Sequence, residues 1–362
     1  MQKLSILLIW SLLLWIGTGC TEAFEKKMRY KPAALGEANE ITIIADDDWW
    51  KAGLQDTALH YFAAPFIITP QPEPILKVRH FSAVDLDRDP LKRGLRMYLI
   101  ISDLSDTASP TTQMVIHQLG MDKINKVRDE NGLNNVILKD VWAQDQRVIY
   151  TFSKDKTQFY DHLRRQAPAI LNAIQTHDQK KVLATTYVEG KDLSIEKKID
   201  STLNVRIDIP EGFFIAVREH DLIWIRKETQ EVSLNMMIKR IPYRDQEQLT
   251  EAGMKSVFEE MGKYVSTDSD GSYMTLNDRD FPTFVYKKKI EELYALEMRG
   301  IWEMNNDFMG GPYAFYAILD DSEKSIIAIN NFVFAPSKSK RNLMQQLECI
   351  VGTIRFKSED VQ

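Results

Sequence analysis

The chain has 362 residues, enough for one large domain or two smaller ones, and its 44% hydrophobic and 27% charged content is ordinary for a globular protein. A formal net charge of −6, with no run of five lysines or arginines, argues against a protein that binds nucleic acid. A chain of this length can bury a core that needs no support from disulfide bonds.

The N-terminus has the anatomy of a secretory signal peptide. Lys3 precedes an apolar run from Leu4 to Ile16, and small residues follow at 17–19, directly before Cys20. The run is shorter than the about 20 apolar residues that a membrane-spanning helix requires. We therefore expect residues 1–19 to be removed.

The cysteine at the expected cleavage position resembles the lipidation site of bacterial lipoproteins. Thr18 and Gly19 fit that signal, whereas Gly17 stands where an aliphatic residue is usual. The resemblance implies that Cys20 carries acyl chains such as palmitate, and that they hold the protein in the cell envelope, at the periplasmic face or in the outer membrane. The alternative is an ordinary signal peptide cleaved near Gly19. Lipidation would leave Cys349 without a disulfide partner.

The first half of the mature chain alternates predicted strands and helices. Residues 20–39 are polar and indicate a tether. We expect Pro168 to kink or break the helix that contains it, and Gly190 to interrupt the next. A boundary is expected near residue 200, which gives halves of 40–200 and 201–362. The predicted strands are 40–45, 75–81, 95–101, 135–142 and 147–152, and the helices 57–66, 112–127, 153–174 and 180–203.

Short, turn-bounded strands in the second half predict an antiparallel meander. Blocks of strands with helices between the blocks predict the α+β class, and we expect two halves that each pack helices on an antiparallel sheet. The predicted strands are 204–209, 213–217, 222–226, 232–239, 283–287, 293–302, 313–319, 325–334 and 353–356, and the helices 246–265 and 338–351.

Two pairs of sequence segments resemble known families. The IPEGF segment at 209–213 and the CIVGTIRF segment at 349–356 are similar to PsbP/Mog1-like α/β/α sandwiches, which implies that fold for the second half. ITIIADDDWWKAG with TPQPEP, at 41–74, and MRGIWEMNNDFMGGPYAFYA, at 298–317, resemble an uncharacterised lipoprotein family of Bacteroidetes, a domain of unknown function. That resemblance implies an envelope location and no particular activity.

No catalytic or metal-binding motif is found, and no cofactor is expected. Adjacent carboxylates at 46–48 on an extended strand point to alternate sides and cannot all reach one ion. The segment 85–89 begins like a calcium loop, but Pro90 and Arg96 occupy the positions of the glycine and the bidentate glutamate. The six histidines form no zinc motif. Cys349 lies in a helical pattern typical of a buried, inert thiol.

The candidates for ligand binding are aromatic residues together with nearby glycines and a carboxylate. Gly310 and Gly311 either supply positive φ angles to a hairpin loop or let a ligand come close to the backbone. Aromatic rings beside carboxylates can hold a sugar, although core packing is their commoner role. The candidates are Trp49, Trp50, Trp302, Asp307, Gly310, Gly311 and Tyr313.

The anchor and the missing catalytic motif favour a non-catalytic lipoprotein that binds or scaffolds an envelope component. Its partners would be the membrane, through the N-terminal lipid, and an envelope protein or glycan. The rival hypothesis is an enzyme that hydrolyses cell-wall glycan or peptide through carboxylates such as Asp307 or those at 46–48.

Overall fold

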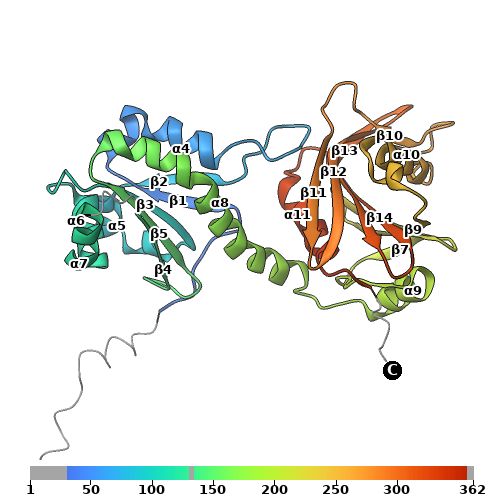
Figure 1. Ribbon diagram of the computed structural model, residues 1–362, viewed down its shortest axis with the longest axis horizontal. Coiled ribbons are helices and arrows are strands. Elements are labelled where there is room, and N and C mark those ends of the chain that lie inside the picture. Colours follow the sequence, from blue (N-terminus) through green and yellow to red (C-terminus); the bar gives the residue numbers. More distant parts are fainter. Residues whose placement is uncertain (1–30, 130–133, 357–362) are drawn as a thin grey trace, which may run out of the picture.

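The computed structural model describes residues 31–129 and 134–356, which form two parts joined through a long helix (Figure 1). The predicted signal peptide, Cys20 and most of the predicted tether lie outside the described residues. Within the described ranges, none of the helices has the length and apolar character needed to cross a membrane. The α+β class is confirmed, with mixed sheets and helices throughout.

The sheet of the first part is mainly parallel, which corrects the expected antiparallel arrangement. Its strand order is β2-β1-β3-β5-β4, and only the β4–β5 pair is antiparallel. Helices link most successive strands, and such crossovers return the chain in the same direction. The strands are β1 (Glu40–Ile44), β2 (Lys77–Phe81), β3 (Met97–Asp103), β4 (Asn134–Lys139) and β5 (Arg147–Ser153).

Helices cover both faces of this sheet (Figure 1). α4 (Gln55–Phe62) and α8 (Lys156–Thr186) bury their apolar side chains against one face. α5 (Ala83–Arg88), α6 (Pro110–Leu119) and α7 (Met121–Asp129) lie against the other. The helix expected over 112–127 is divided at Gly120, whose φ of 81° is incompatible with a continuous helix.

α8 continues through Pro168, which we expected to kink or break it. Pro168 is exposed, so the carbonyl groups that lose their helical donor can bond to water. The helix ends at Thr186, and Gly190 adopts a φ of 105° before α9 (Leu193–Leu203) begins at its cap, Asp192.

The second part is built on an eight-stranded antiparallel sheet, as expected, which curls like half of a barrel (Figure 1). The order is β10-β12-β13-β14-β9-β8-β7, and β11 pairs with β12. The strands are β7 (Phe214–Arg218), β8 (Leu222–Glu228), β9 (Ser233–Pro242), β10 (Met274–Leu276), β11 (Phe284–Ile290), β12 (Leu293–Met304), β13 (Asp307–Asp320) and β14 (Ser325–Phe334). The strand expected at 204–209 is reduced to β6 (Val205–Arg206), which pairs with β15 (Arg355–Phe356) outside this sheet.

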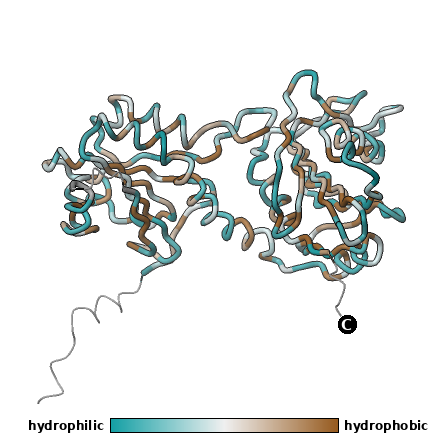
Figure 2. The backbone as a smooth tube through the Cα atoms, viewed as in Figure 1, coloured by the Kyte–Doolittle hydropathy of each residue, from teal (hydrophilic) through white to brown (hydrophobic). Residues whose placement is uncertain are grey.

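The central strands of the curled sheet, β9 and β12 to β14, are buried on both faces along most of their length, which explains the apolar strands in Figure 2. α10 (Glu251–Gly262) packs on one face, and α9 and α11 (Arg341–Val351) pack on the other. Buried Ile195, Ile199 and Leu203 place α9 in the core of the second part. α8, before Gly190, buries its apolar face in the core of the first part, and α9, after Gly190, buries its own in the core of the second part. The two parts therefore meet between α8 and α9, several residues before the expected boundary near 200.

The two parts are joined by polar contacts to α11, which has no side-chain cap of its own. The Glu73 carboxylate of the first part accepts hydrogen bonds from the backbone N–H groups of Lys340 (2.7 Å) and Arg341 (3.0 Å). The Asn39 amide donates to Asn342 (3.1 Å) and Gln345 (2.6 Å) on the same helix. A carboxylate at a helix N-terminus is stabilising, so the first part completes a helix of the second.

Candidate functional site

Three hollows of the described residues are large enough to consider. We call them the edge pocket, at the end of the parallel sheet (about 600 Å³), the mouth pocket, at the end of the curled sheet (about 370 Å³), and the junction groove, between α8 and the second part (about 1160 Å³). Their volumes are those of small-molecule or peptide sites.

The edge pocket lies beyond the carboxyl ends of β1, β2 and β3. Strand order reverses between β1 and β3, and ligands of parallel sheets commonly bind at such a point. The sequence named Trp49 and the carboxylates at 46–48 as candidates, but it did not place them at such a point because an antiparallel sheet was expected. The pocket is lined by Asp46, Asp47, Asp48, Trp49, Ser82, Asp85, Arg88, Asp106, Ser109 and Lys156, among others.

The three carboxylates predicted at 46–48 lie in different surroundings in the edge pocket. Asp46 accepts hydrogen bonds from the hydroxyls of Ser109 and Thr111, each at 2.6 Å, so it ties β1 to α6. Asp47 and Asp48 begin a short helix and are exposed. Within the described ranges, no three metal-ligating side chains are grouped as a metal site would require.

Trp49 and Trp50, predicted as ligand-stacking residues, are buried in the first core. The Trp49 ring packs edge-on against Phe159, with centroids 4.9 Å apart, and its N–H donates to the Tyr160 hydroxyl at 3.1 Å. Trp50 stacks on His80 at 4.3 Å. Trp49 borders the edge pocket, but these contacts are those of packing residues.

Trp302, Tyr313 and Asp307, which were also predicted to bind a ligand, do not lie together in one site. Trp302 lines the mouth pocket. Tyr313 is buried under α10, with its ring 4.7 Å from Phe258. Asp307 lies at the start of β13, where its carboxylate accepts a hydrogen bond from the Phe308 N–H at 2.7 Å, and it borders none of the three hollows.

Gly310 and Gly311 lie inside β13, and neither has the positive φ that a hairpin loop would require. A Cβ on Gly311 would stand 2.0 Å from the Val333 carbonyl oxygen, and one on Gly310 would stand 2.8 Å from the Trp302 carbonyl oxygen. The hairpin-loop expectation for these glycines was wrong, because they lie where neighbouring strands approach closely and not in a turn.

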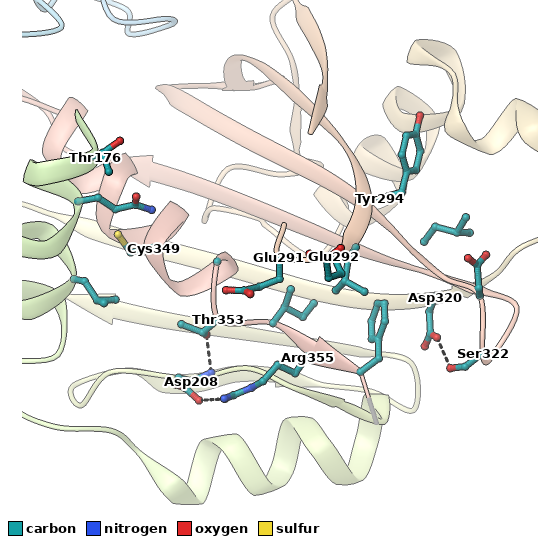
Figure 3. Close-up of a pocket in the computed structure, with 18 of the residues that line it drawn as sticks. Thr176, Asp208, Glu291, Glu292, Tyr294, Asp320, Ser322, Cys349, Thr353 and Arg355 are labelled. Carbon is teal, nitrogen blue, oxygen red and sulfur yellow. Dashed lines mark hydrogen bonds and ion pairs between the residues drawn. The ribbon is translucent and has the colours of Figure 1, made fainter. Parts of the chain in front are cut away.

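The junction groove draws its walls from five separate segments of the chain (Figure 3). Leu183 of α8 and Tyr294 of β12 are each 44% exposed in it. Leu293, Ile354 and Phe356 add apolar surface, and Cys349 lies near its α8 side. No local pattern in the sequence marks this groove, because its parts are brought together only by folding.

Acidic side chains predominate around the groove. Glu291 and Asp321 stand exposed on two hairpin turns, and neither side chain makes an ion pair or hydrogen bond within the described residues. Asp208 is already bound by Lys191 at 2.5 Å and by Arg355, and buried Asp320 by Arg240. The two free carboxylates therefore define the charge that a ligand would meet.

The Cys349 thiol is unsuited to nucleophilic chemistry. It is half-buried, and burial raises its pKa to about 11, with a smaller contribution from Glu348. A thiol with that pKa stays protonated at neutral pH, whereas catalysis requires the thiolate.

Comparisons with known proteins assign one family model to each part. A domain of unknown function (DUF8532) matches residues 34–186, and another (DUF4837) matches residues 192–353. No curated protein matches the chain. Solved structures that match include the Saccharomyces cerevisiae Ran-binding protein Mog1p (8% identity, TM-score 0.28, covering 42% of this chain and 89% of that one) and a Mog1 mutant (9% identity, TM-score 0.28, 44% and 93%). The chain is thus matched along almost all of its described length by two families of unknown function.

Proposed function

We propose that the protein is a lipid-anchored component of the cell envelope that binds a partner protein in the junction groove and catalyses no reaction. The observation that carries the binding role is the groove itself, about 1160 Å³ at the junction of two separately built parts. Ligand sites are common at such junctions. The N-terminal signal pattern and Cys20 support the anchor.

The chemistry of the groove favours a segment that combines basic and apolar side chains. Leu183 of α8 and Tyr294 of β12 offer exposed apolar surface in the groove. Glu291 and Asp321 offer unpaired negative charge at the rim, which attracts a cationic partner and sets its orientation. The groove also contains Lys180, so the basic groups of the partner would lie toward the hairpin turns.

The rival hypothesis of a carboxylate hydrolase has less support. Asp307 lies outside the three hollows, and Asp46 is engaged by two hydroxyl groups. Asp178, whose pKa is raised by burial as a general acid would require, lies in an ion pair with Arg96 and borders none of these hollows.

Lipidation is tested by a Cys20→Ala variant expressed in native cells. The wild type should lose residues 1–19, gain the mass of its acyl chains and sediment with membranes, because several chains anchor a protein durably. The variant should keep its circular dichroism spectrum and move to the soluble fraction. An unmodified wild-type chain in the soluble fraction would refute the anchor.

Partner binding is tested with a fluorescein-labelled peptide of alternating leucines and lysines. The Glu291→Lys/Asp321→Lys double variant should bind it about ten-fold more weakly than the wild type at low salt, because two attractions become repulsions. The Glu219→Lys/Asp268→Lys double variant changes the formal charge by the same amount at two exposed positions outside the groove, and it should bind like the wild type. Equal weakening by both variants would mean general charge attraction and would contradict the groove assignment.

A further inference from the structure

The mouth pocket has the form of a small-molecule site. It lies at the end of the curled sheet, where β8, β9, β12 and β14 converge beyond α10. Its volume of about 370 Å³ falls within the range of ligand pockets, which often occupy the mouths of barrel-like sheets.

The walls of the pocket are aromatic rings and methionines. Trp302 packs edge-on against Phe332, with centroids 5.6 Å apart, and lies 6.4 Å from Phe334. Met304 and Met309 complete this side, and their flexible thioethers can adjust to the shape of a ligand. Such walls favour a mainly apolar occupant.

Two buried hydrogen-bond donors of the lining residues have no acceptor within the described ranges. They are the Trp302 Nε1–H, on a side chain that is 1% exposed, and the Arg226 Nε–H. Buried polar groups nearly always have a partner. Trp224, the other tryptophan of the pocket, follows that rule, since its N–H donates to the Asn235 side chain at 3.2 Å. The unpartnered donors point to an occupant that carries acceptor oxygen.

The charges at the pocket are already neutralised by each other. The Arg226 guanidinium pairs with Glu228, and Glu231 pairs with Lys338 at 2.9 Å. A charged ligand would have to displace one of these pairs or remain uncompensated. The pocket therefore suits a neutral molecule.

We infer that the mouth pocket binds a small, neutral, mainly apolar molecule. This molecule carries at least one oxygen that accepts a hydrogen bond from the Trp302 N–H. Its ring or chain lies among Trp302, Phe332 and Phe334. This site is separate from the junction groove and does not depend on the proposed partner or the anchor.

The test uses prodan, a neutral naphthalene dye with a ketone oxygen, whose emission reports an apolar environment. We expect saturable binding at one site. Trp302→Phe keeps an aromatic ring and removes the N–H, and it should weaken prodan binding about five-fold, the effect of one hydrogen bond. N,N-dimethyl-2-naphthylamine, which lacks the ketone, should bind the wild type and this variant equally well.

A second variant keeps the test decisive if Trp302→Phe disturbs folding. Ser266→Trp places a large ring at the pocket from an exposed loop position and should abolish prodan binding, whereas Ser266→Ala should leave it unchanged. Prodan binding that resists Ser266→Trp, or equal weakening of both dyes by Trp302→Phe in a folded protein, would overturn the inference.

Discussion

Replacing Arg299 with methionine should lower the free energy of unfolding by about 3–5 kcal/mol at pH 7, because the change removes the buried cation that neutralises the buried Glu297 carboxylate and the partly buried Glu348 carboxylate. The Arg299 guanidinium donates to Glu297 at 2.8 Å and to Glu348 at 2.6 Å. It also reaches the Ile67 carbonyl of the first part at 3.3 Å. Urea unfolding followed by circular dichroism measures the loss.

Arg279→Met is the control for this variant. Arg279 is 79% exposed, and its ion pair in the described part of the chain is with its neighbour Asp280, so its loss should change stability by less than about 0.5 kcal/mol. If Arg299→Met lowers the free energy of unfolding by less than about 1 kcal/mol, the ion pairs of Arg299 with Glu297 and Glu348 do not have the stabilising role given to them.

The Arg299 effect should also depend on pH. Burial raises the pKa of Glu297, but Arg299, Lys288 and the Tyr316 hydroxyl outweigh burial and hold that pKa below its ordinary 4.5. A carboxyl with a lowered folded-state pKa stabilises the protein above its unfolded-state pKa and loses that effect as pH falls through the folded-state value. The difference in stability between wild type and Arg299→Met should therefore narrow below about pH 4.5.

Gly311→Ala should cost about 3 kcal/mol of stability, because the added methyl group has no room. Its Cβ would stand 2.0 Å from the Val333 carbonyl oxygen and 3.1 Å from Trp302 Nε1, so β13 and β14 would have to separate. Thermal unfolding of the purified variant measures the change.

Gly94→Ala is the matched control for the glycine variant. Nothing lies within 4 Å of the Cβ that it adds, and its φ is outside the left-handed region. We expect Gly94→Ala to keep or slightly increase stability. If Gly311→Ala unfolds like the wild type, the close approach of the two strands is not what requires glycine there.

The pattern of apolar residues was sufficient to predict most elements of the second part. Strands such as β8 and β14 pair with sequence neighbours or across short turns, and their bounds are close to those expected. In the first part, the strands were found but their direction was not. A strand such as β3, which is buried along its whole length, has the same run of apolar residues whether it is parallel or antiparallel to its neighbours. The connections between the strands determine its direction.

The candidate sites were less predictable than the elements. Trp302 was identified as a ligand candidate and does border a pocket, but its unpartnered N–H depends on what β13 and β14 place around it. Trp49 and Trp50 have the same local appearance and proved to be core residues. An aromatic ring beside a carboxylate has no fixed role until its neighbours are known.

By itself, the sequence determined the element types, the α+β class and the expectation of an N-terminal anchor, because these depend on residues adjacent along the chain. Only the tertiary structure decided the parallel first sheet, the Glu73 cap on α11, the junction groove and the mouth pocket. Each of these joins segments far apart in sequence, such as Glu73 and Lys340, separated by 267 residues. Contacts between residues so far apart depend on how the two parts pack together, and the local pattern of apolar residues does not predict them.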